Sequence, residues 1–210
     1  MIRILIADDH AVVRRGLRQT VSEEHDITVV GEASNAQELL GLVRKQPCDV
    51  VVLDISMPGR SGLDVLIELH REHPKLPILV LSMHSEDQYA MRALRIGAAG
   101  YLTKETAPEE LVKAIRKAVA GGKYVTPSLA EKLALGLGRD SERPLHETLS
   151  EREYQVLCLI ASGKSVTEIS ADLSLSVKTI STYRARILEK MNLKNNAELM
   201  HYAIHNRLVD

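Results

Sequence analysis

Residues 50–59 of the chain read Val-Val-Val-Leu-Asp-Ile-Ser-Met-Pro-Gly, an apolar run that ends abruptly at Asp54. Consecutive apolar positions of this kind are typical of a strand buried on both faces of a sheet. Four similar runs occur within the first 102 residues, and amphipathic segments of helical period separate the five runs from one another. This alternation predicts βα units around a five-stranded parallel, doubly wound sheet, that is, an α/β fold.

Each element can be placed approximately from this pattern. The predicted strands cover residues 2–7, 27–33, 50–53, 78–81 and 100–102. The predicted helices cover residues 12–22, 36–44, 63–72, 87–96 and 108–120. Thr106 and Glu109 have the spacing of a capping box, which predicts the start of the last helix.

The chain is long enough for more than one core, because 210 residues exceed the usual size of one domain, about 100 to 150 residues. Gly121 and Gly122 predict the end of the first domain at residue 122. Residues 123–145 predict a linker that contains one short helix after Thr126. Residues 146–210 contain no strand-like run and predict four helices, with capping boxes at Ser150 to Glu153 and at Ser165 to Glu168.

Composition narrows the class of protein further. No stretch resembles a signal peptide or a membrane span, so we expect a cytoplasmic protein without membrane contact. Cys48 and Cys158 lack metal-ligand spacing and are interpreted as reduced packing residues. His201 and His205 would share a helical face, but two ligands make a weak metal site. The net charge of -1 gives no support to nucleic-acid binding, which must be argued from local charge.

Polar residues gather at the predicted carboxyl ends of the strands, where functional groups collect in open parallel sheets. They are Asp8, Asp9, Asp54, Ser82 and Lys104. Three adjacent carboxylates repel one another, so a hard cation such as Mg²⁺ is the expected occupant. An Asp after a strand is also ordinary turn chemistry, so only the whole set is specific.

Such a pocket suits phosphoryl transfer. The Asp54 carboxylate can attack a phosphoryl group whose charge the metal and Lys104 neutralise. Ser82 is placed to donate a hydrogen bond to a phosphoryl oxygen after transfer.

The first 120 residues resemble a two-component response-regulator receiver domain. The residues that carry this likeness are Asp8-Asp9, Leu53 to Gly59 with Gly62, Ser82 and Tyr101-Leu-Thr-Lys104. The resemblance implies a flavodoxin-like fold and makes Asp54 the phosphoryl acceptor from a sensor histidine kinase. It further implies that Asp8, Asp9, Asp54 and the backbone carbonyl of Ser56 hold Mg²⁺, Asp8 mainly through water. Ser82 and Tyr101 would form the switch pair of that family.

The third helix of the second domain combines a core face with a small polar face. Ile180, Ile187 and Met191 fall on one side at about 100° per residue. Another side carries Lys178, Ser181, Thr182 and Ala185. Small polar side chains near a helix start allow entry into the DNA major groove. Residues 176–194 hold five basic side chains and one acidic one, a local charge of +4 suited to phosphates.

Residues 146–210 are similar to the LuxR-type helix-turn-helix. The likeness rests on Leu149 to Glu153, Gly163-Lys-Ser, Glu168-Ile169, Leu175 to Thr179 and Arg186 to Lys190. It implies base contacts from Ser181, Thr182 and Ala185, and phosphate contacts from Lys178, Thr179, Arg184 and Arg186. Together the two resemblances indicate the NarL/FixJ class of response regulators. The implied partners are promoter DNA with inverted half-sites, a second copy of the phosphorylated chain, and RNA polymerase.

Two other functions remain open at this point. One is a phosphatase or mutase that uses an aspartyl-phosphate and Mg²⁺, although Ser56 stands where such an enzyme needs a second acid-base carboxylate. The other is a receiver that acts through a protein partner, with the helical domain as a docking module.

Overall fold

The structure, a computed structural model, describes residues 1–57, 60–83, 86–136, 144–206 and 208–209. The chain divides into two compact units, Met1–Lys132 and Leu133–Asp210. Pro58 and Gly59, and residues 137–143 of the expected linker, lie outside the described residues. The bounds of that linker, 123–145, therefore stay a prediction.

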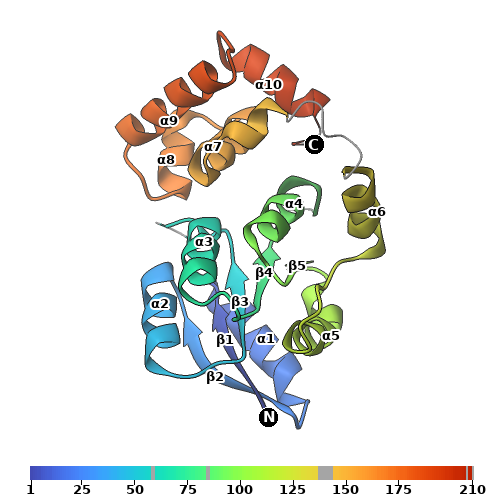
Figure 1. Ribbon diagram of the computed structural model, residues 1–210. Helices are drawn as coiled ribbons and strands as arrows, with labels where there is room; N and C mark the ends of the chain where they lie inside the picture. The colour runs from blue at the N-terminus through green and yellow to red at the C-terminus, as the bar shows by residue number, and fades with distance from the viewer. Residues whose placement is uncertain (58–59, 84–85, 137–143, 207, 210) are drawn as a thin grey trace. The chain divides into compact units, whose positions relative to one another are not determined.

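The first unit contains a five-stranded parallel sheet (Figure 1). Its strands are β1 (Ile2–Ala7), β2 (Ile27–Ala33), β3 (Val50–Asp54), β4 (Ile78–Ser82) and β5 (Gly100–Thr103). Their order in the sheet is β2-β1-β3-β4-β5, and every neighbouring pair is parallel. The predicted doubly wound α/β fold is confirmed, and β3, β4 and β5 each extend one residue beyond the predicted end.

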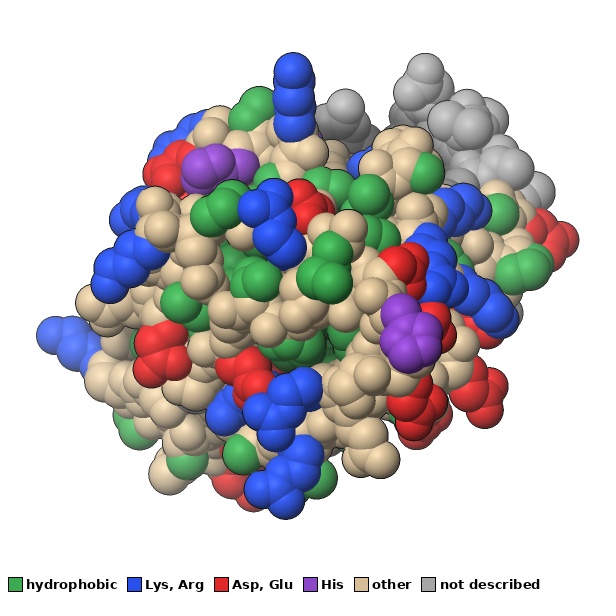
Figure 2. All heavy atoms as spheres, turned by 90° about the horizontal axis from the view of Figure 1, so that it is seen from below, with side chains coloured by type: hydrophobic (Ala, Val, Ile, Leu, Met, Phe, Trp, Pro, Cys, Tyr) green, Lys and Arg blue, Asp and Glu red, His purple; other side chains and the backbone are tan. Residues whose placement is uncertain are grey.

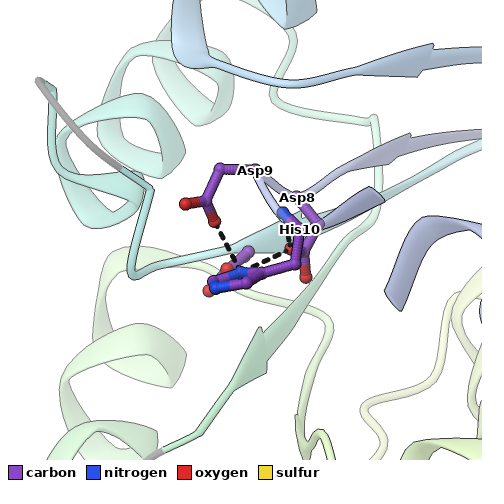
Figure 3. A group of neighbouring side chains, drawn as sticks. Asp8, Asp9 and His10 are labelled. Atoms are coloured by element: carbon purple, nitrogen blue, oxygen red, sulfur yellow. Dashed lines mark hydrogen bonds and ion pairs between the residues drawn. The ribbon is translucent and has the colours of Figure 1, made fainter. Parts of the chain in front are cut away.

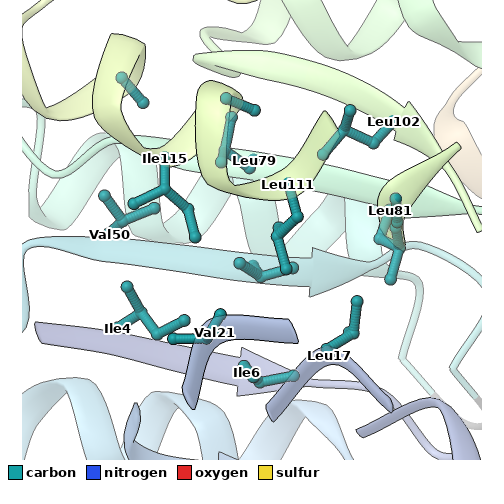
Figure 4. Packing of buried hydrophobic residues seen from close by; sticks show 14 of the residues in the cluster. Ile4, Ile6, Leu17, Val21, Val50, Leu79, Leu81, Leu102, Leu111 and Ile115 are labelled. Atoms are coloured by element: carbon teal, nitrogen blue, oxygen red, sulfur yellow. The ribbon is translucent and has the colours of Figure 1, made fainter. Parts of the chain in front are cut away.

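Helices cover the sheet as the βα pattern predicts. They are α1 (Ala11–Ser22), α2 (Ala36–Lys45), α3 (Gly62–Glu72), α4 (Glu86–Ile96) and α5 (Ala107–Val119). Helices α1 and α5 contact each other and bury Leu17, Val21, Leu111 and Ile115 against the same layer of strand side chains (Figure 4). Each large apolar side chain buried in this way stabilises the fold by about 1.5–3 kcal/mol. The resulting core fixes the strand ends that carry the polar residues.

The start of α5 differs from the predicted capping box. Thr106 has a helical backbone (φ -86°, ψ -16°), and its side chain caps no amide of α5. Instead its amide donates to Thr103 Oγ1 at 3.2 Å, and its own hydroxyl donates to the Thr103 carbonyl at 3.3 Å. The predicted helix start is confirmed, since Thr106 is the N-cap of α5, but the predicted capping box is wrong because the Thr106 hydroxyl and amide both bond to Thr103 at the end of β5.

The remaining helices follow the expected order. Helix α6 (Pro127–Gly136) is the short helix expected after Thr126, and a 3₁₀ turn covers Leu145–Thr148. The four helices of the second unit are α7 (Glu151–Ala161), α8 (Val166–Asp172), α9 (Val177–Lys190) and α10 (Asn196–His205). Both predicted capping boxes are confirmed, at the starts of α7 and α8.

The second unit is built around the buried face of α9. Ile180, Ile187 and Met191 are at most 1% exposed, as their helical spacing predicts, and α9 packs against both α7 and α8. The turn between α8 and α9 passes through Ser174, which has a left-handed backbone (φ 52°). After this turn, one face of α9 packs against α8. The other face of α9 is exposed to solvent.

Two further sequence expectations concern membrane-spanning helices and the thiols. Within the described ranges, no helix combines the length and the apolar character that crossing a bilayer requires. Cys48 is half-buried and Cys158 is buried, and both are free thiols. At the end of the first unit where the chain begins, acidic and basic side chains are interspersed (Figure 2).

Candidate functional site

Three charged side chains meet at the carboxyl edge of the sheet. Asp8 follows β1, Asp54 ends β3, and Lys104 follows β5. The Lys104 Nζ lies 2.7 Å from Oδ2 of Asp54 and 2.7 Å from Oδ2 of Asp8. Both carboxylates are fully buried and the lysine side chain is 6% exposed. The structure thus brings together residues that lie up to 96 positions apart in the sequence, as the strand-end argument predicts.

The Asp54 carboxylate is held from two sides. Its Oδ1 accepts a hydrogen bond from the Ser56 amide at 2.8 Å, and its Oδ2 accepts one from Lys104. Helix α3 begins so close to the end of β3 that a Cβ on Gly62 would lie 2.4 Å from the Asp54 carbonyl oxygen. Only glycine avoids that clash, so only glycine lets α3 start this close to Asp54.

Burial and hydrogen bonding shift the pKa values of Asp54 and Lys104 in opposite directions. Burial raises the pKa of Asp54, and the hydrogen bonds from Lys104 and Ser56 counter only part of that rise. Burial lowers the pKa of Lys104, but its bonds to Asp54 and Asp8 outweigh that effect and leave the pKa raised. Lys104 therefore stays a cation that faces both buried carboxyl groups.

The two residues expected to form a switch pair lie on adjacent strands. Ser82 is the last residue of β4 and is fully buried, and its carbonyl accepts the Lys104 amide at 2.8 Å. Tyr101 lies in β5 opposite Val80 and is also fully buried. Ser82 thus shares the edge that carries Asp54 and Lys104, and the Tyr101 ring is enclosed by protein.

The pocket has the ligand atoms that a divalent cation needs. Asp8, Asp9, His10 and Asp54 each offer one atom, and these atoms lie within 4.8 Å of one another. Asp8 Oδ2 and Asp9 Oδ1 are both buried; the first lies 2.7 Å from the Lys104 ammonium and the second 2.9 Å from the His10 ring nitrogen Nδ1. Three carboxylates facing one ammonium leave a charge of about -2, which a divalent ion would offset.

His10 is the member of this group that the sequence reasoning missed. The available signal was its position directly after two carboxylates, Asp8-Asp9-His10, at the end of the first predicted strand. By contrast, His201 and His205 on α10 only stack on each other, with ring centroids 6.4 Å apart. Among the described residues this pair joins no group of three ligands, which leaves it the weak site that the sequence indicates.

The exposed face of α9 carries the residues expected to contact DNA. Lys178, Ser181, Thr182, Ala185 and Arg186 are exposed, and Thr179 and Arg184 are partly exposed. A hollow of about 320 Å³ lies along this face, lined by Ser176, Lys178, Thr179, Thr182, Tyr183 and Arg186. Tyr183 was absent from the sequence-based set, although it follows Thr182 directly.

Hydrogen bonds within the second unit show how these side chains are oriented. The hydroxyls of Ser181 and Thr182 each donate to the backbone carbonyl four residues earlier, at 2.9 Å, so their oxygens remain acceptors. Arg184 Nε donates to Asn196 Oδ1 at 2.6 Å, which fixes the guanidinium against α10. Lys190 pairs with the buried Glu153 at 2.6 Å, so the effective positive charge of this region is smaller than the count of +4 suggests.

A parallel α/β unit with a lysine-held aspartate at its carboxyl edge, followed by a four-helix unit that exposes one helix, defines a receiver domain joined to a helix-turn-helix domain. Residues 4–116 match the family described as response regulator receiver domain, and residues 147–203 match the family described as bacterial regulatory proteins, luxR family. The chain therefore belongs to the NarL/FixJ class: it is a two-component response regulator with a LuxR-type DNA-binding domain.

Relatives match this chain over nearly its whole length. It is 39% identical to the response regulator UvrY of Escherichia coli K12 over 210 residues, 99% of this chain and 96% of that protein. RcsB of Salmonella enterica serovar Typhimurium, solved bound to the promoter P1flhDC with the phosphomimetic BeF3-, is 31% identical. That match covers 96% of this chain and 97% of RcsB, with a TM-score of 0.66.

A further RcsB structure contains two dimers bound to two parallel DNAs. It is 30% identical, covers 100% of this chain and 99% of that chain, and has a TM-score of 0.60. Membership of the response regulators excludes the phosphatase or mutase reading, since this family transmits signals and does not turn over a substrate.

Proposed function

We propose that Asp54 accepts a phosphoryl group from a sensor histidine kinase and that the modified receiver controls DNA binding by α9. The observation that carries this proposal is the meeting of Asp8, Asp54 and Lys104 at 2.7 Å separations in a buried pocket. A structural ion pair would need one carboxylate for one ammonium. A second and third carboxylate beside it raise the electrostatic energy of the fold unless a further positive charge enters.

Mg²⁺ is the ion that fits these oxygen ligands. Asp9, Asp54 and the backbone carbonyl of Ser56 would hold it, and Asp8 would act mainly through water. When bound, it neutralises charge on the equatorial oxygens of the transferring group. The clustering of ligand atoms from Asp8, Asp9 and Asp54 within 4.8 Å of one another supports this assignment.

The protein's own residues then carry the transfer. An Asp54 oxygen attacks the phosphorus of the kinase's phosphohistidine, the P–O bond forms, and the P–N bond breaks with the imidazole as leaving group. Lys104, which stays cationic, moves its ammonium from the Asp54 carboxylate to a phosphoryl oxygen. The product is an aspartyl-phosphate that water hydrolyses slowly.

Ser82 and Tyr101 would convert this chemical change into a conformational one. The Ser82 hydroxyl donates to a phosphoryl oxygen, and the Tyr101 ring follows into the space that the end of β4 vacates. The phosphoryl group shifts the equilibrium only by its differential stabilisation of one state. A basal fraction of active protein is therefore expected without phosphorylation.

In the active state α9 enters the major groove of promoter DNA. Ser181, Thr182 and Ala185 face the bases, and Lys178, Thr179, Arg184 and Arg186 lie near phosphates. One module of this size buries little DNA surface, so two copies on inverted half-sites are expected to raise affinity and specificity. The dimers in the RcsB–DNA structure support this assembly. RNA polymerase is a further partner under this proposal, which also places the protein in the cytoplasm.

The test compares genome-wide DNA occupancy of the native chain with that of Asp54→Asn. We expect fewer or weaker specific sites for the variant, whose amide cannot be phosphorylated. Treatment of both proteins with phosphoramidate and Mg²⁺, followed by peptide mass spectrometry, should place the phosphoryl group on Asp54 of the native chain only. Equal occupancy by the two proteins would argue against control by phosphorylation.

A receiver that acts through a protein partner makes a different prediction. In that case, footprinting on promoter DNA would show no protection even with the fully phosphorylated chain. The hollow beside Thr182 and Arg186 would then bind a partner's side chain instead of a nucleic acid.

A further inference from the structure

The His10 ring lies at the exposed rim of the acidic pocket, directly before the start of α1. Its Nδ1 is 2.9 Å from Asp9 Oδ1 and 3.3 Å from Asp8 Oδ1, as Figure 3 shows. Its backbone amide donates to the same Asp8 oxygen at 2.8 Å. The side chain is 61% exposed and caps no amide of α1. Neither core packing nor helix capping therefore accounts for the direction in which the ring points.

These separations are hydrogen-bond and ion-pair distances, and they also equal the spacing of neighbouring ligands around one ion. Adjacent donor atoms in an octahedron with bonds of about 2.1 Å lie about 3.0 Å apart. The two distances from Nδ1, 2.9 Å and 3.3 Å, bracket that value. Asp54 also belongs to this group, whose ligand atoms all lie within 4.8 Å of one another. Opposite ligands in the same octahedron lie about 4.2 Å apart, so a limit of 4.8 Å leaves the four groups close enough to surround one ion after small side-chain shifts.

The ring changes the chemistry of the donor set. Carboxylate and carbonyl oxygens suit Mg²⁺, whereas an imidazole nitrogen favours first-row transition metals such as Ni²⁺ and Zn²⁺. We propose that His10 Nδ1 is a metal ligand in this pocket and that it makes the site bind nitrogen-preferring divalent metals more tightly than an all-oxygen receiver site would. Mg²⁺ keeps water at the position that the ring takes for those metals. This proposal rests on the metal site proposed above, and it adds a preference of that site for one class of divalent metal.

The experiment measures metal affinity by calorimetry with Mg²⁺ alone and with Ni²⁺ alone. The parent protein carries His201→Ala and His205→Ala, because the stacked pair on α10 would otherwise bind Ni²⁺. His10→Ala is then compared with His25→Ala, an exposed histidine outside the pocket. We expect the Ni²⁺ affinity to fall about tenfold or more in His10→Ala, while the Mg²⁺ affinity changes less than about twofold. His25→Ala should change neither.

A spectroscopic readout identifies the ligand directly. Electron spin echo modulation of the Cu²⁺-loaded parent should show coupling to an imidazole ¹⁴N, because Cu²⁺ prefers imidazole nitrogen, and His10→Ala should lack it. An equal loss of Mg²⁺ and Ni²⁺ affinity, or ¹⁴N coupling that survives in His10→Ala, would overturn the proposal while leaving the metal site intact. If the parent protein binds neither metal, the proposed metal site itself fails.

Discussion

Lys104 and Asp54 are 50 positions apart in the sequence, yet the ammonium of one donates to the carboxylate of the other at 2.7 Å. The same ammonium lies 2.7 Å from Asp8. Because β5 and β3 are separated in the sheet by β4 alone, a side chain after one strand reaches the end of the other. A single lysine thus holds two buried carboxylates at the position where the charge of a transferring phosphoryl group would develop.

Replacing Lys104 should slow phosphorylation severely. In Lys104→Ala, no cationic side chain faces the equatorial oxygens during transfer, and the loss of one such stabilising group costs about 10²–10³-fold in rate. Phosphorylation by phosphoramidate in the presence of Mg²⁺, followed over time by mass spectrometry, measures the effect. Lys113→Ala, which removes an exposed lysine on α5, is the control and should react at the native rate. A native rate for Lys104→Ala would exclude the proposed role.

Gly62→Ala should destabilise the receiver unit and displace Asp54. The added Cβ would meet the Asp54 carbonyl oxygen and the Ile55 Cα at 2.4 Å, and both are backbone atoms that cannot rotate away. The expected loss in the free energy of unfolding is about 1–3 kcal/mol. Gly16→Ala is the matched control, because nothing lies within 4 Å of its Cβ in α1.

That control should gain about 0.5–1 kcal/mol from helix propensity. Urea unfolding of the full chain, followed by circular dichroism, distinguishes the two variants. Equal stability of both variants would show that the loop after β3 relaxes freely.

Ser82→Ala should separate phosphorylation from its effect on DNA binding. The variant keeps Asp54 and Lys104, so it should accept the phosphoryl group at a rate near that of the native chain. It lacks the hydroxyl that would bind the phosphoryl oxygen. Coupling between two sites commonly changes the affinity of one of them by about 5–150-fold. We expect phosphorylation of Asp54 to raise the DNA affinity of the native chain by a factor in this range, and most of that factor to be lost in Ser82→Ala.

Promoter affinity with and without phosphorylation gives the coupling for each protein. Thr103→Ala is the control, because it also removes a hydroxyl next to Ser82: Thr103 on β5 is the strand partner of Ser82 on β4. The Thr103 hydroxyl accepts a hydrogen bond from the Thr106 amide. If Ser82→Ala responds to phosphorylation as fully as Thr103→Ala does, another group must sense the phosphoryl oxygen.

Lys178→Ala should weaken DNA binding almost equally across sequences. A lysine that contacts a phosphate releases one counterion, so its loss lowers the slope of log K against log salt by about 1. Thr182→Ala, at a position proposed to face a base, should instead relax sequence preference with little change in slope. Binding isotherms at several salt concentrations measure both effects. A change in base preference for Lys178→Ala alone would reverse the two assignments.

The stability of the helical unit should depend on pH through Glu153. Burial raises the pKa of Glu153, but the hydrogen bonds from Lys190 and Ser150 outweigh burial and leave the pKa below its ordinary value of 4.5. A lowered carboxyl pKa stabilises the fold above pH 4.5, and that contribution is lost as the pH falls through the folded-state value.

Glu153→Gln should therefore lower the free energy of unfolding by about 1 kcal/mol at neutral pH, and the difference should shrink below about pH 4. Thermal unfolding of both proteins between neutral and acidic pH measures it. Glu189→Gln, at an exposed position on α9, serves as the control for the change from carboxylate to amide. A constant difference at every pH would mean that the ionised carboxylate is not the stabilising form.

The sequence alone determined the features that depend on neighbouring residues. Apolar runs predicted the interior strands β3 and β4, in which every residue is buried, because burial on both faces requires consecutive apolar side chains. Ser150 and Ser165 predicted helix starts correctly because a capping box closes within four residues. The polar residues after the strands predicted the pocket because parallel strands end at one edge.

Only the tertiary structure decided which side chains meet at longer range or compete locally. The Thr103 hydroxyl displaces the cap expected of Thr106, and Glu153 neutralises Lys190 across 37 positions. His10 joins Asp8 and Asp9 because the chain turns at the start of α1 and directs the ring back over the carboxylates. Such contacts depend on the directions of side chains and on the geometry of packed elements, which spacing along the chain does not specify.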